Sequence, residues 1–282
     1  MASTSELVQP VAQEARAVIE RIRFVLVETS LTGNQGAVAR ALKTMGLTDL
    51  ALVKPRRTPD AEALARAAGA DDILQNAAVH DRLPAALHDC RLVIGASARR
   101  RAVEWPLLSP AAAAEHLVTE AAHGPVALVL GRESSGLSNE ELAHCHYLTQ
   151  IPANPAFSSL NLASAAQVFA YEIRQTWLTT YAAEQSPSSA ASASSDSSAP
   201  FATHASPPHQ PAGADEMASF FEHLRTTLIR VGFAKPEQSY KLLQRLRRLF
   251  NRARPDRTEL NILRGLLKAL GRHAEAGTDA DR

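Results

Sequence analysis

The sequence predicts a parallel α/β fold followed by a small all-helical domain. Three observations support this fold class. Short apolar runs alternate with helical patterns over residues 22–181, residues 184–214 are rich in Ser, Ala and Pro, and residues 215–271 carry leucines at helical spacing. Alternation of strands and helices is typical of parallel sheets, and a Ser/Ala/Pro-rich stretch has too little apolar surface to fold.

The predicted strands are short, nearly continuous apolar runs rich in β-branched residues, as strands covered on both faces should be. They span residues 22–27, 50–53, 92–96 and 126–130, and a further strand is expected to end at Ile151. Helices are expected between them, each followed by glycine, over residues 36–45, 59–67 and 110–122. Residues 160–181 are predicted as a long closing helix with one apolar face.

The linker at 184–214 divides the chain. We expect an N-terminal extension (1–21), an α/β domain (22–183), a flexible linker (184–214) and a basic helical domain (215–282). Residues 215–282 hold 14 Lys and Arg against 9 Asp and Glu, whereas residues 1–214 hold 16 against 20. A basic tail favours an anionic partner, although a solvated helical face is equally compatible with charge alone.

Within the tail, one predicted helix has an apolar face and a basic stripe at i, i+4, i+7 and i+11. The stripe is Lys241, Arg245, Arg248 and Arg252. Such an array could bind a phosphate backbone or could simply be a solvated surface. Asp256 with Glu259 is typical of a capping box that opens a last helix, expected to end before Gly271.

Composition excludes several classes of protein. No apolar run is long enough to span a bilayer, and the N-terminus lacks a secretion pattern, so a cytoplasmic location is expected. Cys90 and Cys145 are too few for a disulfide framework or a four-ligand metal site. His144 and His146 flank Cys145 without good zinc spacing, and we expect a helix end leading into a strand there; no metal is expected.

Polar residues follow several predicted strands, where an α/β sheet usually binds its ligand. Each group singly is typical of a turn or helix cap, but together they predict a site. They are Asn34 and Gly36, Ser97 to Arg101, Gly131 to Glu133, and Asn154 to Asn161. The glycine fingerprint of dinucleotide-binding folds and the phosphate-binding P-loop are both absent, which argues against a nucleotide-dependent oxidoreductase.

The exact amino-acid sequences of three segments are more informative than their composition. Residues 34–40 (NQGAVAR), 129–141 (VLGRESSGLSNEE) and 151–163 (IPANPAFSSLNLA) resemble the three motifs of the SPOUT RNA 2′-O-ribose methyltransferases, and most closely the bacterial tRNA-modifying members. The resemblance covers roughly residues 22–181 and implies a C-terminal trefoil knot, an exception to the general absence of knots.

The resemblance also implies a cofactor, S-adenosylmethionine, bent within the knot. Its binding loops correspond to Ala96, Ser97, Ala98, Gly131, Ile151, Ser158, Ser159 and Leu160. Small residues suit this task because backbone groups must approach the ligand closely. Arg99, Arg100 and Arg101 are expected to contact RNA together with the tail stripe.

The catalytic residues implied by the resemblance are Arg40 and, around it, Asn34, Glu133, Ser159 and Asn161. A guanidinium keeps its proton at any physiological pH, so we expect Arg40 to stabilise a developing 2′-oxyanion rather than act as a base. Glu133 either orients Arg40 or a substrate hydroxyl, or caps the helix predicted near Asn139.

These motifs imply a tRNA ribose 2′-O-methyltransferase, with cytidine or uridine at anticodon-loop nucleotide 32 as the target by family analogy. The alternatives are another tRNA or rRNA site, or a non-catalytic RNA-binding factor of the same fold. A homodimer paired through residues 160–181 is also implied, since that helix carries apolar residues on more than one face.

Overall fold

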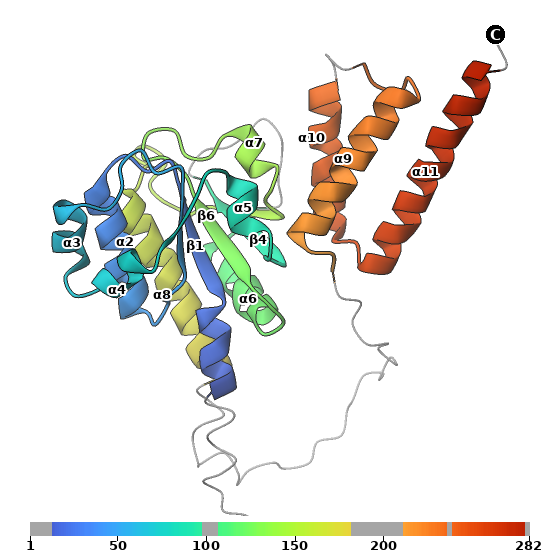
Figure 1. Cartoon of the computed structure of the whole chain (residues 1–282). Coiled ribbons are helices and arrows are strands. Elements are labelled where there is room, and N and C mark those ends of the chain that lie inside the picture. Colours follow the sequence, from blue (N-terminus) through green and yellow to red (C-terminus); the bar gives the residue numbers. More distant parts are fainter. Residues whose placement is uncertain (1–12, 98–106, 182–210, 236–238, 280–282) are drawn as a thin grey trace, which may run out of the picture.

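The α/β region of the chain is built on one parallel seven-stranded sheet (Figure 1). The computed structural model describes residues 13–97, 107–181, 211–235 and 239–279. The strand order is β3-β2-β1-β6-β4-β7-β5. The strands are β1 (Ile22–Val27), β2 (Leu50–Val53), β3 (Ala78–His80), β4 (Leu92–Ala96), β5 (Leu107–Leu108), β6 (Val126–Leu130) and β7 (Tyr147–Thr149).

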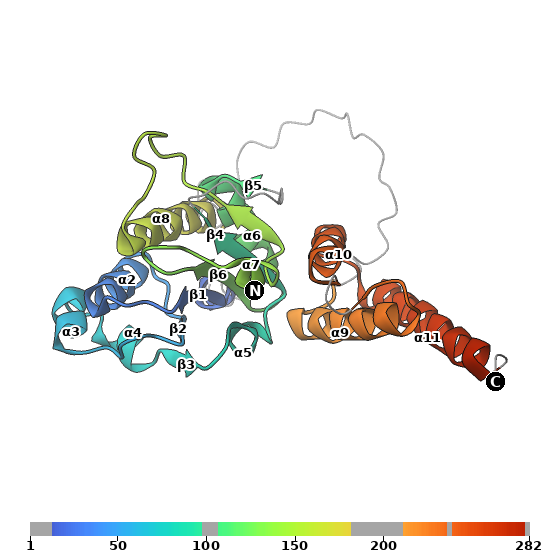
Figure 2. The same cartoon turned by 90° about the horizontal axis from the view of Figure 1, so that it is seen from above.

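The central strands are apolar on both faces because helices cover both faces. On β1, Phe24 and Leu26 join one buried cluster while Val25 and Val27 join another. The first cluster lies beneath α2 (Thr32–Thr44), α6 (Pro110–Ala121) and α8 (Leu162–Tyr181). The second is closed by α5 (Leu83–Leu87) and α7 (Asn139–Leu142), and Figures 1 and 2 show the two layers on either side of the sheet.

Four strands and the helix at 110–122 were predicted nearly to the residue. The last apolar strand, β7, ends at Thr149 rather than Ile151. Helix α8 begins at Leu162 rather than residue 160, because the Asn161 side chain accepts hydrogen bonds from the N–H groups of Ala163 and Ser164 and so caps the helix. The short edge strands β3 and β5 were not predicted.

Helix α2 begins at Thr32 rather than residue 36, so Asn34 lies within the helix and not in a polar loop before it. Gly36 faces α3 (Ala61–Ala67), where a Cβ would overlap the carbonyl oxygen of Ala63. The glycine therefore permits close helix packing rather than a turn. By contrast, Gly46 and Gly136 have φ values of 77° and 67° and do form turns. Helix α3 begins at Ala61 rather than residue 59, and a short helix, α4 (Asp71–Gln75), follows it.

The C-terminal region forms α9 (Ala214–Arg230), α10 (Ser239–Ala253) and α11 (Arg257–Asp279) around their own apolar cluster (Figure 2). The predicted capping box is confirmed: the Asp256 N–H donates to Glu259 Oε2 and the Glu259 N–H to Asp256 Oδ1. The expected end before Gly271 is wrong, since α11 continues to Asp279. A helix-interior glycine weakens a helix by about 1 kcal/mol and does not by itself end it.

The helical region contacts the α/β region near the amino ends of β4 and β7. The Asn251 amide donates to the carbonyl oxygens of Ala143 and Cys145, which precede β7. Arg254 forms an ion pair with Glu120 at 2.9 Å, and Glu120 also lies 3.6 Å from Arg91. Partial burial raises the pKa of Glu120, but the hydrogen bond from Arg254 and the positive charges of Arg254 and Arg91 together outweigh burial and lower that pKa.

The described parts of the chain contain neither a membrane-spanning helix nor a metal-binding cluster. No helix there is long and apolar enough to cross a membrane. No group of three or more His, Cys, Asp or Glu residues is placed to hold a metal ion within those parts. Cys90 and Cys145 are buried thiols, and His144 to His146 connect α7 to β7 as the sequence indicated.

Stability should fall with acid partly because of His146. Its Nδ1 accepts a hydrogen bond from the Val93 N–H, and burial lowers its pKa from 6.5 to about 4. The unfolded chain therefore takes up a proton first, and stability present above about pH 6.5 is lost as pH falls towards 4. This residue should account for about 2 kcal/mol of unfolding free energy between about pH 7.5 and 5.

Urea unfolding at the two pH values measures this effect. His146→Gln keeps an acceptor for Val93 and should lose less stability in acid than the wild type does. His88→Gln removes a histidine whose side chain is 73% exposed and should leave the acid loss unchanged. Equal acid losses for wild type and His146→Gln would contradict the prediction.

Candidate functional site

A pocket opens at the carboxyl ends of β4, β6 and β7, where a parallel sheet is expected to bind its ligand. Its empty volume is about 940 Å³, which includes the space at its mouth that is open to solvent. Seven of the eight predicted cofactor-binding residues line it. They are Ala96, Ser97, Gly131, Ile151, Ser158, Ser159 and Leu160. Ala98 lies outside the described residues, as do Arg99, Arg100 and Arg101.

The loop after β6 forms one wall of the pocket and folds back on itself. Arg132 and Gly136 are paired by two backbone hydrogen bonds, of 3.3 and 2.9 Å. A Cβ at Gly131 would overlap the backbone of Gly136, so only glycine permits this approach. The wall is therefore a tight turn of fixed shape.

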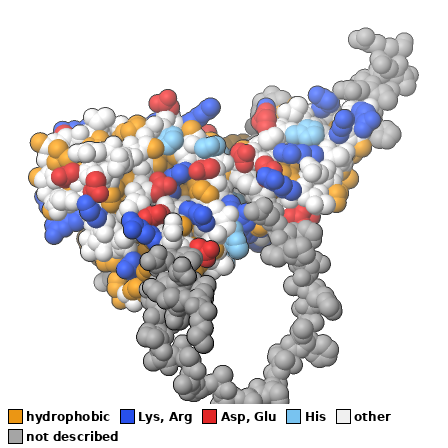
Figure 3. Space-filling view, turned by 60° about the horizontal axis from the view of Figure 1, so that its bottom comes forward, with side chains coloured by type: hydrophobic (Ala, Val, Ile, Leu, Met, Phe, Trp, Pro, Cys, Tyr) orange, Lys and Arg blue, Asp and Glu red, His pale blue; other side chains and the backbone are white. Residues whose placement is uncertain are grey.

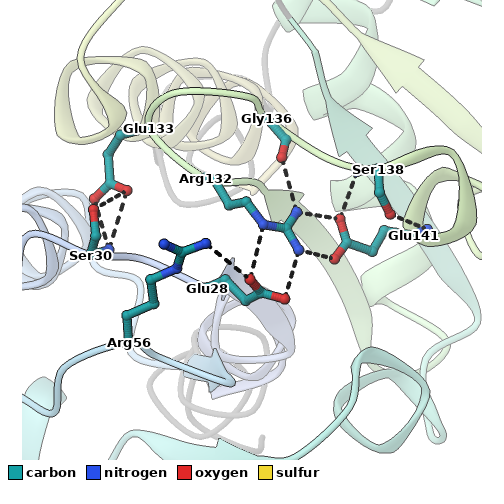
Figure 4. Close-up of polar contacts among 8 residues, drawn as sticks. All are labelled: Glu28, Ser30, Arg56, Arg132, Glu133, Gly136, Ser138 and Glu141. Carbon is teal, nitrogen blue, oxygen red and sulfur yellow. Dashed lines mark hydrogen bonds and ion pairs between the residues drawn. The ribbon is translucent and has the colours of Figure 1, made fainter.

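The Arg132 side chain holds this turn against two carboxylates (Figure 4). Its guanidinium donates two hydrogen bonds of 2.9 Å to Glu141 and lies 2.7 Å from Glu28 Oε1. These bonds raise the pKa of Arg132 and lower the pKa of Glu28. Glu141 also accepts from the Ser138 N–H, which completes the capping box of α7. One arginine thus ties together β1, the turn and α7.

Glu133 points to the opposite side of the turn, towards the start of α2 (Figure 4). Its carboxylate accepts hydrogen bonds from the N–H groups of Ser30 and Leu31, the Ser30 hydroxyl and the Asn34 amide. Partial burial raises its pKa, but these hydrogen bonds outweigh burial and lower it. The expected cap near Asn139 is wrong, because Glu133 binds the segment that leads into α2. Helix α7 is capped by Ser138 instead.

A hydrogen-bond chain connects all three motifs. Asn34 Nδ2 donates to Glu133 at 3.1 Å, and Asn161 Nδ2 donates to Asn34 Oδ1 at 3.0 Å. The three residues come from α2, the β6 loop and the residue before α8. The structure therefore brings together three of the five residues predicted as catalytic, and a fourth, Ser159, lines the pocket beside them.

The fifth, Arg40, lies apart. It is exposed on α2, six residues after Asn34, which places the two side chains on different faces of the helix. Among the described residues, no hydrogen bond or ion pair joins the Arg40 guanidinium to the network, and Arg40 does not line the pocket. Within one chain, the guanidinium is directed elsewhere than the predicted catalytic centre.

Several residues of the site were not predicted. Thr149, Leu162, Ala165 and Phe169 line the pocket, the last three from the first turns of α8. The Thr149 hydroxyl is buried and lacks a hydrogen-bond partner in the part of the chain that is described. Their signals were weak: an apolar helix face predicts core, and a threonine ending a strand is ordinary.

The predicted basic stripe of the tail lies on α10. Lys241, Arg245 and Arg252 are exposed, and Arg248 is half-buried. In Figure 3, Lys and Arg side chains gather over the C-terminal helices among hydrophobic ones. The stripe is separate from the contacts that Asn251 and Arg254 make with the α/β region.

The arrangement of loops, sheet edge and helical tail agrees with comparisons to known proteins. The profile of the SpoU rRNA Methylase family matches residues 21–171. The chain belongs to the SpoU methylase family. A second profile, the C-terminal domain of the tRNA methyltransferase TrmJ, matches residues 215–279. The expectation of a methyltransferase is confirmed.

Relatives extend the similarity over most of the chain. A tRNA (cytidine/uridine-2′-O-)-methyltransferase TrmJ from Klebsiella pneumoniae is 48% identical over 253 residues, covering 90% of this chain and 97% of the relative. The Pectobacterium atrosepticum TrmJ is 47% identical over 256 residues, with 90% and 98% coverage. The crystal structure of TrmJ from Z. mobilis ZM4 superposes with a TM-score of 0.72 at 30% identity, covering 88% and 98%.

Arg132→Met should destabilise the protein by about 2 to 4 kcal/mol, because it removes the cation that bridges two partly buried carboxylates. Arg132→Lys keeps the charge but loses the paired hydrogen bonds and should cost less, about 1 to 2 kcal/mol. Chemical unfolding measures both. Lys43→Met removes an exposed ion pair with Asp72 and should change stability little. Similar losses of stability for Arg132→Met and Lys43→Met would show that Arg132 does not hold the turn.

Proposed function

We propose that the protein methylates a ribose 2′-hydroxyl in tRNA with S-adenosylmethionine as methyl donor, acting on cytidine or uridine at anticodon-loop nucleotide 32. The observation that carries the proposal is the hydrogen-bonded Glu133–Asn34–Asn161 network beside the pocket, in a protein nearly half identical to TrmJ over most of its length. Nucleotide 32 rests on family analogy.

The pocket fits the proposed cofactor. Its floor consists of small residues and strand ends, so backbone groups are accessible to an adenine and a ribose. The unpartnered Thr149 hydroxyl offers a hydrogen bond at the same place. When bound, S-adenosylmethionine supplies an activated methyl group on a sulfonium. Gly131, Ile151 and Leu160 would hold it.

The protein's own residues would mainly position the acceptor oxygen. Asn34 and Asn161 present amides that can hold a ribose hydroxyl, and Glu133 fixes both their geometry and the start of α2. We assign Arg40 to the developing 2′-oxyanion and an adjacent phosphate, where a permanent cation stabilises negative charge. The hydroxyl proton would pass to phosphate or water.

The remaining architecture is part of the proposal. We infer a trefoil knot formed by the C-terminal part of the α/β domain, at residues 22–183, where the cofactor would be bent. An N-terminal extension (1–21) and a flexible linker (184–214) would flank that domain. Residues 215–282 would form the tRNA-binding domain, with Lys241, Arg245, Arg248 and Arg252 on phosphates and Arg99 to Arg101 closer to the site.

The decisive test is to map ribose methylation in total tRNA from a strain that lacks the gene. Loss of methylation at nucleotide 32 alone, restored by the wild-type gene, is expected. Loss at another tRNA or rRNA nucleotide would correct the target, and no change at any nucleotide would favour a non-catalytic RNA-binding role. Arg40→Ala should fail to restore methylation while the purified variant still binds S-adenosylmethionine, because Arg40 does not line the pocket.

We also propose a homodimer with composite sites, because Arg40 is turned away from its own pocket and a second copy could supply it. Helix α8 leaves less apolar surface exposed for pairing than its sequence predicted. Phe169 is buried in the chain's own core and Trp177 donates to the Ala15 carbonyl, which leaves Tyr171, 49% exposed, as its most exposed aromatic residue.

Mixing two inactive variants tests the shared site. Arg40→Ala removes the guanidinium, and Gly131→Trp blocks the pocket wall. After subunit exchange, about half of the dimers are mixed, and each contains one intact composite site, so activity should recover to about a quarter of wild type. A monomer by sedimentation, or no recovery after verified exchange, would refute the arrangement.

A further inference from the structure

We propose that residues 54–57 (Lys-Pro-Arg-Arg), called here the basic loop, are a second RNA-phosphate contact on the α/β region, next to the site. The proposal rests on the proposed function, because the RNA is the tRNA substrate. Lys54, Arg56 and Arg57 are all exposed, and they directly follow β2 at the same edge of the sheet as the pocket.

The basic loop is held rigidly. The Lys54 N–H donates to the His80 carbonyl at 2.9 Å, and the Arg56 N–H donates to the Thr29 carbonyl at 3.0 Å. The buried Gln35 amide donates both to the Arg57 carbonyl and to the Thr29 hydroxyl. Backbone groups rather than charged side chains fix the loop, so the cations are displayed without being used to hold it.

The same contacts fix the loop relative to the site. Thr29 precedes Ser30, which donates to Glu133, and Gln35 follows Asn34 on α2. In Figure 4, Arg56 lies beside Glu28, between the Ser30–Glu133 pair and Arg132. Strands β2 and β6 are separated by β1 alone, a distance of about 10 Å at about 4.8 Å per strand. That distance corresponds to about three successive stacked nucleotides of one strand.

The carboxylates near the basic loop do not fully neutralise the positive charges of its Lys and Arg side chains. Arg56 lies 3.7 Å from Glu28, but Glu28 is already paired with Arg132 at 2.7 Å. Arg57 pairs with Asp60 at 3.0 Å while its side chain remains 62% exposed, and exposed pairs of this kind exchange readily for phosphate. Phosphate oxygens suit guanidinium groups particularly well.

A competing explanation is that these cations only neutralise Glu28 and Asp60. If neutralisation were their only role, the double variant Lys54→Gln/Arg57→Gln would bind tRNA as wild type does. This variant keeps Arg56 and therefore the Glu28 contact. A matched control is Arg16→Gln/Lys43→Gln, which also removes one Lys and one Arg. Arg16 and Lys43 are exposed, and each pairs with a carboxylate away from the basic loop.

The experiment measures binding of an unmodified tRNA transcript to the full chain over a range of salt concentrations. The Lys54→Gln/Arg57→Gln variant should bind on the order of 10-fold more weakly at about 0.1 M salt. The slope of log affinity against log salt should become shallower by about 1.4 to 1.8, at about 0.7 to 0.9 per lost phosphate contact. The control should match wild type, and Lys54→Arg/Arg57→Lys should restore the slope.

Binding of S-adenosylmethionine and the urea midpoint confirm that each variant is folded. Wild-type affinity and slope in Lys54→Gln/Arg57→Gln, or an equal loss in the control, would overturn the proposal. This outcome is distinct from failure of the proposed function. If the wild-type protein methylates tRNA, the proposed function holds whether or not the basic loop binds RNA. If wild type methylates no tRNA, the proposed function fails whatever the binding slopes are.

Discussion

The ion pairs of Arg132 hold the site together. This guanidinium joins Glu28 at the end of β1 to Glu141 in α7, and so closes the turn whose opposite side presents Glu133 to α2. Three chain segments distant in sequence thereby acquire one geometry. Without this cation, the two partly buried carboxylates would repel each other, and the turn would lose the contact that fixes it.

The fold was largely predictable, and its errors have local causes. Central strands such as residues 126–130 are covered on both faces and therefore read as continuous apolar runs. The edge strand at 78–80 has exposed residues and three-residue length, so its sequence carries no such pattern. Gly36 was misassigned because a sequence does not show which neighbour approaches a helix; the reason for the glycine is the carbonyl of Ala63 on another helix.

The site was predictable in membership but not in arrangement. Resemblance to known motifs identified Asn34, Glu133 and Asn161, and the structure joins them by hydrogen bonds. It could not show that Glu133 binds the segment before α2, because that contact depends on how the β6 loop meets the first motif. The expected helix began after Asn34, so the sequence also did not show that Arg40 and Asn34 lie on different faces of one helix. The basic loop was missed because three neighbouring polar residues after a strand are typical of any surface turn.

The attachment of the helical region has a consequence for substrate size. Asn251 and Arg254 anchor it near the amino ends of β4 and β7, whereas the pocket opens at the carboxyl ends. A five-residue strand such as β4 is about 17 Å long, so an RNA touching both surfaces of one chain must extend at least that far. The length of the sheet therefore sets the smallest RNA that one chain can contact at both ends.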